Sequence, residues 1–254
     1  MEKKIAIITG ASGGIGREFC RYIYEAVDEI WAIARNEKKL ATLQEELGDK
    51  ILPISKDLSK PEDVRTIGQM LENANVTVAY LINNAGVAKM GTYQDFSVKE
   101  VEETIHINCS AVAVLCTMCI PYMLAGSRIL NISSSSSFQP LPYLNLYAAT
   151  KVFVRSYSRS LNVELKKKGI TVTAVCPGWV DTELLMKEIN GKPVKFAGIV
   201  TADRVARVAL RDAKKGKDMS VCSLYFKFEH VLTKIFSQKT AMRTWCRNIR
   251  KYGF

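Results

Sequence analysis

Short apolar runs rich in β-branched residues alternate with helix-like stretches along most of this chain. The runs expected to form strands are Lys4–Thr9, Glu29–Ala34, Lys50–Ile54, Val78–Ile82, Arg128–Ile132, Ile170–Cys176 and Asp218–Leu224. The helix-like stretches lie near residues 14–26, 36–47, 61–73, 97–124, 145–168 and 201–216. Nearly continuous apolar strands are typical of a parallel sheet that is covered on both faces. The alternation therefore predicts an α/β, doubly wound fold with a seven-stranded, mostly parallel sheet and helices on both faces.

Composition places the chain among ordinary globular proteins. Of its 254 residues, 48% are apolar and 24% are charged, which excludes a disordered or collagen-like chain. We find no linker in the sequence and expect one domain over residues 1–254. The longest apolar run, Ala111 to Ile120, is about half of the ~20 residues that a membrane span needs. The first apolar stretch is too short for a signal-peptide core, so we expect a cytoplasmic protein whose seven cysteines are free thiols.

A glycine-rich turn, Thr9-Gly10-Ala11-Ser12-Gly13-Gly14-Ile15-Gly16, follows the first predicted strand. Glycine allows a sharp turn and a close approach of phosphate, and the next helix offers unpaired N–H groups to an anion. The alternative is a tight turn without a ligand, but the position directly after strand one favours a dinucleotide. We therefore expect a Rossmann-type cofactor site. Its expected cofactor-binding residues are Gly10, Ser12, Gly14, Ile15 and Gly16.

The end of the second predicted strand bears on the choice of dinucleotide. It reads Ile33-Ala34-Arg35-Asn36 and holds no acid. An Asp or Glu there would bond the 2′-hydroxyl of NAD, whereas an arginine can bind the 2′-phosphate of NADP bidentately. The sequence favours NADP(H) over NAD(H), unless Arg35 only pairs with a surface acid such as Glu37. Asp57 and Leu58, after the third strand, are expected at the rim of an adenine pocket, although a plain surface turn fits them nearly as well.

Tyr147 and Lys151 are four residues apart on a long predicted helix, which places them on one face. A nearby ammonium favours the phenolate, so the lysine should lower the pKa of Tyr147 from about 10 and make it a usable acid or base. Such pairs are common on amphipathic helices. Two further residues strengthen the interpretation of this pair as a reacting group. Ser134 lies thirteen positions before Tyr147. Asn108 lies in the middle of a predicted helix, where an Asn is unfavourable unless its side chain makes hydrogen bonds.

Together these features resemble the short-chain dehydrogenase/reductase family over roughly residues 3 to 224. The matching motifs are Thr9-Gly10-x-x-x-Gly14-Ile15-Gly16, Asn83-Asn84-Ala85-Gly86, Asn108, Ser134, Tyr147-x-x-x-Lys151 and Pro177-Gly178-x-x-x-Thr182. Each motif is modestly specific, whereas all six in this order and spacing are very specific. The chain differs from many relatives at Ser135-Ser136-Ser137-Phe138, where a small glycine-containing turn is more usual.

The resemblance implies an oxidoreductase that interconverts a ketone and a secondary alcohol with NADP(H). It implies that Tyr147 exchanges a proton with the substrate oxygen and that Ser134 hydrogen-bonds the same oxygen. Lys151 would lower the pKa of Tyr147 and hold the nicotinamide ribose. Asn108 would bend its helix and hold a water of a proton relay.

Three further residues receive cofactor roles from the same resemblance. Asn84 would line the adenosine side of the cleft, and Val180 and Thr182 would hold the nicotinamide carboxamide. The resemblance also implies a homodimer or homotetramer, built through the two long helices that carry Asn108 and Tyr147.

Residues 182–200 are expected to form the substrate loop. Its apolar residues at helical spacing are Leu184, Leu185, Met186 and Ile189. They suit either a small helix packed on the core or a mobile lid over the nicotinamide. The aromatic residues expected to complete an apolar pocket are Phe138, Tyr143 and Trp179. Such a pocket suggests a hydrophobic substrate, steroid-like or acyl-chain-like.

The C-terminal residues 225–254 carry seven basic residues and one acid, a net charge of +6 out of +11 for the chain. Apolar residues are interleaved with the charges, which predicts a basic amphipathic helix. We expect it to cover a sheet edge, or else to form a subunit contact or a weak peripheral membrane contact. The charge is not concentrated on a recognition element, so no nucleic-acid partner is expected.

Two other groups of residues in the sequence are of types that can carry chemistry. Cys116 and Cys119 form a C-x-x-C in mid-helix without a second ligand pair, which indicates buried thiols and no metal site. His106 and His230 are the only histidines, 124 positions apart, which leaves little for a Ser-His-Asp hydrolase or a His-rich metal site. The alternative to the enzyme is a dinucleotide-binding sensor or scaffold held at membranes by the basic tail. Such a sensor would not need a proton donor like Tyr147.

Overall fold

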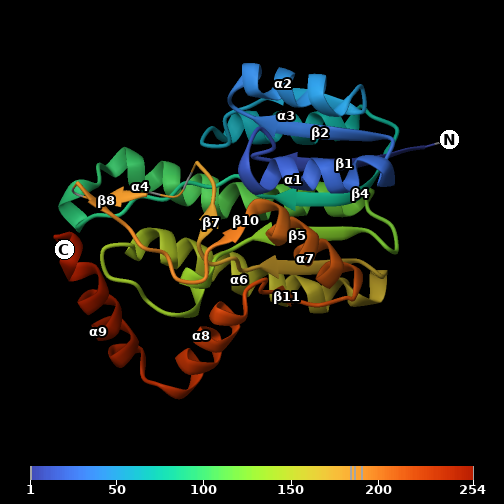
Figure 1. Cartoon of the computed structure of the whole chain (residues 1–254). Coiled ribbons are helices and arrows are strands. Elements are labelled where there is room, and N and C mark those ends of the chain that lie inside the picture. Colours follow the sequence, from blue (N-terminus) through green and yellow to red (C-terminus); the bar gives the residue numbers. More distant parts are fainter. Residues whose placement is uncertain (1, 184, 186, 190, 254) are drawn as a thin grey trace.

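The computed structural model describes residues 2–183, 185, 187–189 and 191–253. One seven-stranded sheet runs through the molecule in the order β11-β6-β5-β4-β1-β2-β3 (Figure 1). The strands are β1 Lys3–Thr9, β2 Glu29–Ala34, β3 Ile51–Ser55, β4 Val76–Asn83, β5 Arg128–Ile132, β6 Thr171–Val175 and β11 Met219–Ser220. Each neighbouring pair is parallel. The predicted doubly wound α/β fold is confirmed.

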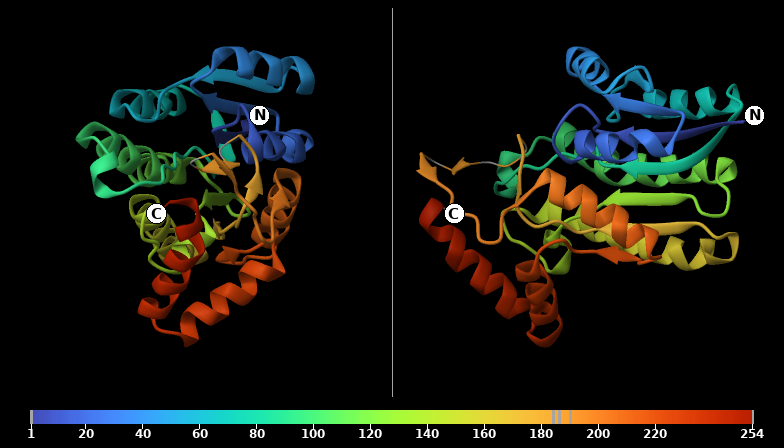
Figure 2. Two further views of the ribbon diagram at one scale, coloured as in Figure 1. Left: turned by 60° about the vertical axis from the view of Figure 1, so that its left-hand side comes forward. Right: turned by 45° about the vertical axis from the view of Figure 1, so that its right-hand side comes forward.

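Helices cover both faces of this sheet (Figure 2). One face packs against α1 Gly14–Ile23, α2 Glu37–Leu47 and α7 Ala202–Lys214. The other packs against α3 Pro61–Glu72, α5 Ala111–Cys119 and α6 Asn145–Leu165. Side chains of β1 alternate between the two cores, with Ala6 and Ile8 in the first and Ile5 and Ile7 in the second. This alternation explains why the strand is apolar at successive positions.

The predicted elements match the structure to within about two residues, except at the last strand. We expected a strand over Asp218–Leu224, but only Met219 and Ser220 pair with β6, and helix α8 begins at Leu224. The reason is that β11 is an edge strand with a single neighbour. Beyond Ser220 the chain leaves the sheet, and Val221 and Phe226 pack together in a small core of their own.

The predicted long helix over 97–124 is a continuous helical stretch in several parts. It comprises α4 Val98–Ile105, a π-helical turn His106–Ser110, α5 and a short 3-10 turn Ile120–Tyr122. By length and mean hydropathy (1.6) this stretch is apolar enough to cross a membrane. Its inner face is built into the protein core, where Leu115, Cys116 and Cys119 are buried. It therefore behaves as a core helix here.

The substrate loop contains strands in place of the helix considered from its spacing. Glu188–Ile189 (β8) pairs antiparallel with Lys192–Pro193 (β9). Val180–Asp181 (β7) pairs with Val200–Thr201 (β10), which closes the base of the loop. Leu184 and Met186 lie outside the described residues. Backbone pairing within the hairpin therefore overrides the helical spacing of the apolar residues.

The C-terminal segment forms two helices, α8 Leu224–Ile235 and α9 Gln238–Ile249. Figures 1 and 2 place them at the end of the molecule where the strands finish. Phe226 of α8 packs with Ala174 and Cys176 at the carboxyl end of β6 and with Val221 after the edge strand β11, so α8 contacts this edge of the sheet at its carboxyl end. The indole of Trp245 on α9 donates to the carbonyl oxygen of Pro142 at 2.8 Å, which ties the second helix to the loop before α6.

Candidate active site

The glycine turn joins β1 to α1 at the carboxyl edge of the sheet. Gly10 and Gly14 have positive φ angles of 63° and 52°, which favour glycine. A Cβ on Gly16 would overlap the carbonyl oxygen of Gly10, so the helix can approach the turn only with glycine at this position. A Cβ on Gly13 would meet no atom within 4 Å, so the backbone faces open space at the start of α1. The turn therefore has the shape of an anion site at a helix N-terminus, as a pyrophosphate requires.

The end of β4 is tied to this turn by side-chain hydrogen bonds. Backbone N–H groups of Asn84 and Ala85 each donate to Oγ1 of Thr9 at 3.0 Å. The Nδ2 of Asn84 donates to the carbonyl oxygen of Gly10 at 3.1 Å. These bonds place Asn84 beside the glycine turn and on the wall of the main cavity.

Arg35 follows β2 and is exposed, and among the described residues its guanidinium forms no ion pair. A surface pair with Glu37, the alternative considered from sequence, is therefore not seen. Asn36 caps α2, because its Oδ1 accepts from the N–H of Lys39 at 3.0 Å. Asp57 shapes the turn after β3 by accepting from the N–H of Ser59 at 3.0 Å. Leu58 beside it is buried in the core under α3.

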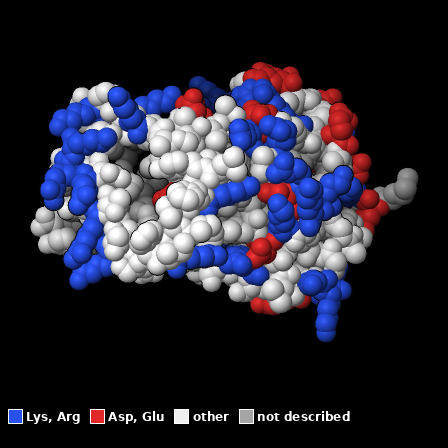
Figure 3. Space-filling view, turned by 60° about the horizontal axis from the view of Figure 1, so that its bottom comes forward, with Lys and Arg blue, Asp and Glu red and all other residues white. Residues whose placement is uncertain are grey.

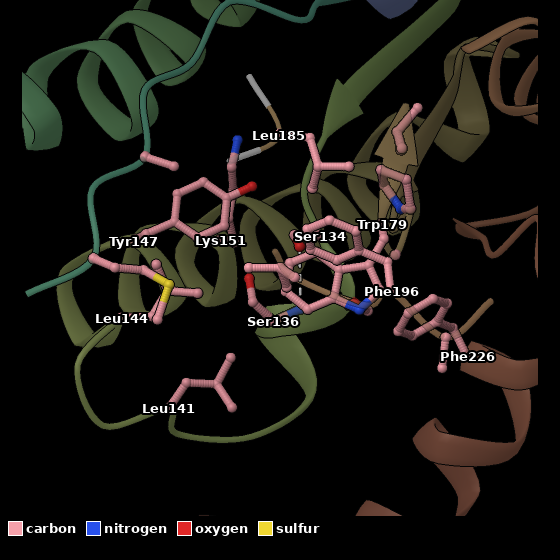
Figure 4. Close-up of a pocket in the computed structure, with 18 of the residues that line it drawn as sticks. Ser134, Ser136, Leu141, Leu144, Tyr147, Lys151, Trp179, Leu185, Phe196 and Phe226 are labelled. Atoms are coloured by element: carbon pink, nitrogen blue, oxygen red, sulfur yellow. Dashed lines mark hydrogen bonds between the residues drawn. The ribbon is translucent and has the colours of Figure 1, made fainter. Parts of the chain in front are cut away.

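Tyr147, Lys151 and Ser134 meet at the centre of the cavity (Figure 4). Tyr147 and Lys151 lie on successive turns of α6, and Ser134 follows β5. The Nζ of Lys151 donates to the carbonyl oxygen of Ile132 at 2.8 Å and lies 5.5 Å from the centroid of the Tyr147 ring. Ser134 lies near enough to Tyr147 for its hydroxyl to lower the pKa of the phenol. A phenol, a hydroxyl and an amine therefore converge on one point.

Burial controls the ionisation of this group. It raises the pKa of Tyr147, and the hydroxyl of Ser134 lowers it only in part. Burial also lowers the pKa of Lys151 to about 8. The structure thus differs from the expectation that the ammonium lowers the pKa of the phenol. The physical reason is that desolvation disfavours both the phenolate and the ammonium.

The serine run surrounds Ser134 with supporting hydrogen bonds. Ser133 Oγ donates to the carbonyl oxygen of Lys151 at 2.7 Å, and Ser137 Oγ donates to the carbonyl oxygen of Ser134 at 2.6 Å. The N–H of Ser136 donates to Oγ of Ser134 at 3.1 Å. Residues Ser135–Phe138 form a 3-10 turn, which replaces the glycine-containing turn of many relatives. The run therefore holds the hydroxyl of Ser134 against Tyr147.

Asn108 lies in the π-helical turn between α4 and α5 and is fully buried. Its Nδ2 donates to the carbonyl oxygen of Val87 at 2.9 Å and to Oγ1 of Thr150 at 3.0 Å. Its Oδ1 accepts from the N–H of Val87 at 2.9 Å. These bonds connect the segment after β4 to α6, one residue before Lys151. The departure from regular helix at Asn108 matches the expected bend.

The cavity has a volume of about 470 Å³ and runs from the glycine turn to the C-terminal helices. Ile15, Val180 and Thr182 line its cofactor end. Figure 4 shows Leu141 and Leu144 on one side of Tyr147 and the rings of Trp179, Phe196 and Phe226 on the other. The wall is thus apolar beyond the reacting group, as in most small-molecule sites.

Comparisons with known proteins agree with this geometry. A model of the short chain dehydrogenase family matches residues 4–192, about three quarters of the chain. The chain belongs to the short-chain dehydrogenase/reductase family. It is therefore an oxidoreductase that acts on an alcohol or ketone with a nicotinamide dinucleotide. The turn at Gly13 and the cavity that leads from it to Tyr147 fit such a cofactor.

Two curated relatives illustrate the range of the match. An uncharacterised oxidoreductase of Staphylococcus epidermidis is 27% identical over 207 residues, covering 81% of this chain and 90% of the relative. The very-long-chain 3-oxoacyl-CoA reductase of Anas platyrhynchos is 33% identical over 192 residues, covering 70% of this chain and 60% of the relative.

Two solved structures are similar along most of their length. A short-chain dehydrogenase from Sphingobium yanoikuyae in complex with NADPH has a TM-score of 0.73 and 28% identity, covering 86% of this chain and 87% of that one. A 3-ketoacyl-(acyl-carrier-protein) reductase from Brucella melitensis complexed with NADH has a TM-score of 0.73 and 25% identity, covering 86% and 95%. The neighbours of this short-chain dehydrogenase/reductase thus include complexes with both kinds of dinucleotide.

The sequence identified only part of the substrate end. Trp179 lines the cavity as expected, whereas Phe138 packs behind it against the ring of His230, 4.2 Å away between centroids. Of the residues on the C-terminal helices, those that line the cavity include Phe226, Glu229, Trp245, Ile249 and Tyr252. None of these was predicted as a site residue. In the sequence, only the aromatic residues of the basic segment 225–254 indicated that this segment could contribute to a pocket.

Two polar atoms in this wall are buried without a hydrogen-bond partner in the described structure. They are the Oγ of Ser136 and the Oε2 of Glu229. Both residues line the cavity. Burial raises the pKa of Glu229, and no charged neighbour offsets that effect. Buried polar atoms of this kind are uncommon in proteins unless a ligand or water satisfies them.

Among the described residues, no group of His, Cys, Asp or Glu is placed to hold a metal ion. Cys116 and Cys119 are fully buried, and burial raises the pKa of Cys116 to about 12. They are therefore inert thiols in the core.

Proposed function

We propose that the protein is an NADP(H)-dependent reductase that interconverts a ketone and a secondary alcohol on an apolar substrate. The observation that carries the proposal is the convergence of Tyr147, Ser134 and Lys151 at the junction of a dinucleotide groove and an apolar cavity. A dinucleotide bound there supplies or accepts the hydride.

The protein residues handle the proton and the developing charge. The hydroxyl of Tyr147 gives its proton to the substrate oxygen in reduction and takes it back in oxidation. Ser134 donates a hydrogen bond to the same oxygen, where negative charge develops. Lys151, held by the carbonyl of Ile132, offers positive charge to the phenol once its proton has left. The same ammonium would hold the ribose of a bound nicotinamide dinucleotide. Asn108 orders the segment between Lys151 and solvent through Thr150 and Val87, and a water beside it would relay the proton.

The preference for NADPH rests on the end of β2. Arg35 is exposed and has no acidic partner among the described side chains, so its fork is available to a 2′-phosphate. Lys38 in the first turn of α2 adds positive charge nearby, whereas Lys39 is paired with Glu183 at 2.6 Å. The structure from Sphingobium yanoikuyae, with its bound NADPH, supports this choice by similarity.

The substrate combines an apolar body with a polar group away from the reacting carbonyl. The apolar walls of the cavity accommodate an acyl-chain-like or steroid-like body, and the two reductases of oxoacyl substrates among the relatives support the former. The unpartnered Oγ of Ser136 and Oε2 of Glu229 would meet a hydroxyl on the substrate. A substrate that satisfies both atoms gains affinity, because it removes the penalty of leaving them unpaired.

A panel of apolar ketones and secondary alcohols, followed at the NADPH absorbance band, tests the proposal. We expect turnover with NADPH that exceeds turnover with NADH, and faster reaction with bulky apolar ketones than with small polar ones. Absence of turnover across the panel with both dinucleotides, in protein that binds them, would contradict it and favour a sensor.

The same proposal includes a cytoplasmic homodimer or homotetramer. Helices α5 and α6 expose the apolar side chains of Val114, Val152 and Phe153, which would pack between subunits. Light scattering after gel filtration measures the mass. Substituting Phe153 by Glu should shift the protein toward the monomer, whereas an unchanged mass would place the contact elsewhere.

A further inference from the structure

Helix α8 exposes a continuous row of large apolar side chains. Leu224, Phe228, Val231 and Ile235 are spaced by four, three and four residues, so they share one face of the helix. Their exposed fractions are 77%, 63%, 51% and 69%. Tyr225 and Phe236 extend the same exposed apolar area. An apolar surface of this size on a folded protein marks a contact with a partner or a membrane.

Helix α9 carries a complementary row of positive charge. Lys239, Arg243, Arg247 and Arg250 are spaced by four, four and three residues and line one groove together with Met242 and Cys246. Residues 230–253 contain no Asp or Glu. None of the four basic side chains has an acidic partner among the described residues. Figure 3 shows Lys and Arg gathered at the edge formed by the C-terminal helices, beside a broad area with few charges.

We propose that α8 and α9 form a docking surface for an anionic lipid membrane. The apolar row of α8 enters the interface between headgroups and acyl chains, and the basic row of α9 binds the headgroups. This is the combination by which amphipathic helices bind membrane surfaces.

The positive charge of this segment distinguishes between the partners that could bind the surface. A second copy would bring one segment of net charge +6 against another, and like charges repel. A nucleic acid would use the arginines but leave the row from Leu224 to Ile235 in water. An anionic bilayer satisfies both rows, because it offers negative headgroups directly above an apolar phase.

The inner faces of the same helices wall the substrate cavity. Phe226 and Glu229 of α8 and Trp245 and Ile249 of α9 line it, while the apolar and basic rows face outward. Docking would therefore place the apolar end of the cavity beside the bilayer, where hydrophobic substrates accumulate. This route for substrate rests on the proposed reductase function, whereas the docking itself does not.

Flotation of the full-length protein with vesicles tests the docking. Vesicles of phosphatidylcholine alone are compared with vesicles that also contain phosphatidylglycerol. We expect binding to the anionic vesicles that is at least tenfold stronger than to neutral ones and that falls as salt is raised. Equal or absent binding to both kinds of vesicle would overturn the proposal.

Paired variants separate the two rows. Phe228→Ser with Ile235→Ser should weaken binding to anionic vesicles by about tenfold or more, because two buried side chains are lost. Arg243→Gln with Arg247→Gln should weaken it by roughly 20-fold, because each charge contributes near the surface. The matched controls are Tyr93→Ser with Val98→Ser and Lys167→Gln with Lys168→Gln, which change exposed residues elsewhere and should leave binding unchanged.

Each variant is first checked for NADPH binding and for reduction of a water-soluble ketone without vesicles. That assay reports on folding and on the reductase function separately from docking. Variants of the α8 and α9 rows that bind vesicles as well as the native protein would refute the docking surface. A loss of dimer in Phe228→Ser with Ile235→Ser, without any vesicle binding by the native protein, would identify a subunit contact instead.

Discussion

The Nζ of Lys151 lies 5.5 Å from the centroid of the Tyr147 ring and donates to the carbonyl oxygen of Ile132 at 2.8 Å. The lysine is therefore held by the end of β5 and not by the phenol. Lys151 is buried and Tyr147 is partly buried, and desolvation moves each group toward its neutral form. A cofactor and substrate that add polar groups to this pocket would favour the charged forms needed for proton transfer.

Removal of the phenol hydroxyl should abolish turnover and spare cofactor binding. In Tyr147→Phe we expect kcat to fall by about 10²–10⁴-fold, because the proton donor is lost. The affinity for NADPH, measured by fluorescence, should change less than threefold. Ser134→Ala should show a smaller loss in kcat, on the order of 10²-fold. Unchanged turnover in Tyr147→Phe would end the mechanism proposed here.

Deprotonation of Lys151 should slow the reaction at alkaline pH. Its pKa is lowered to about 8 by burial, so the ammonium is lost as the pH rises through that value. We expect kcat/KM for reduction to fall above about pH 8. In Lys151→Arg the fall should move to much higher pH, because a guanidinium stays protonated. A pH profile that is identical in the two proteins would assign the fall to another group.

Burial of Lys151 should lower the free energy of unfolding at neutral pH. Its folded pKa lies below the ordinary value of 10.5, so the unfolded chain binds more protons between about pH 8 and 10.5. The destabilisation is complete below pH 8 and disappears above 10.5. Lys151→Met should therefore unfold at higher denaturant concentration than the native protein at pH 7, and the difference should shrink toward pH 10. A difference independent of pH would show that packing, not charge, causes it.

Arg35 should determine dinucleotide preference. Arg35→Ala should lower the ratio of NADPH to NADH affinity by about 10–100-fold, because charge-assisted hydrogen bonds to a phosphate are lost. Arg65→Ala, an exposed arginine on α3, is the matched control and should keep the native ratio. Titration of both dinucleotides against each variant measures the ratio. If Arg35→Ala retains the native ratio, selection of NADPH lies elsewhere.

Two glycines should respond in opposite ways to alanine. Gly16→Ala should destabilise the fold, because the new Cβ overlaps the carbonyl oxygen of Gly10. Gly13→Ala should leave stability nearly unchanged, since its backbone is extended and its Cβ meets nothing within 4 Å. It should nevertheless weaken NADPH binding by at least tenfold, because the Cβ occupies the space expected for phosphate. Denaturant unfolding and NADPH titration distinguish the two effects. Native affinity in Gly13→Ala would move the phosphate away from this turn.

The buried carboxyl of Glu229 should lower the stability of the protein and raise its selectivity for hydroxylated substrates. Burial raises the pKa of Glu229, so the folded protein keeps this proton longer than the unfolded chain does, and stability falls as the pH rises from the ordinary value of 4.5 toward the folded pKa. Glu229→Leu should therefore be more stable than the native protein at pH 7, with no such gain at pH 4. It should also lose about tenfold in kcat/KM on a hydroxylated ketone, relative to the matched ketone without the hydroxyl. Equal losses on both ketones would indicate a change of shape only.

Local patterns in the chain were enough to predict the sheet, its helices and the residues Tyr147, Lys151 and Ser134 that line one cavity. Strands and helices follow from short-range periodicity, and the glycine turn and the Tyr147–Lys151 pair are local in sequence. For the sheet and the Tyr147–Lys151 pair, two outcomes differed from expectation. The last strand ended at Ser220 because an edge strand has one neighbour, and the pKa of Tyr147 rose because burial depends on the whole fold.

The far wall of the cavity depends on contacts between distant segments. The indole of Trp245 reaches the carbonyl of Pro142, more than a hundred residues earlier, and Phe226 packs where a Cβ on Gly178 would overlap its ring. No spacing in the tail indicates such contacts.

The amino-acid sequence by itself determined the fold class, the glycine turn and the pairing of Tyr147 with Lys151 on one helix, because each is specified by residue types at short separations. Only the tertiary structure decided which helix faces line the cavity, which polar atoms stay unpaired and which groups lose their solvation. Those properties arise when segments far apart in the chain exclude water from the same space.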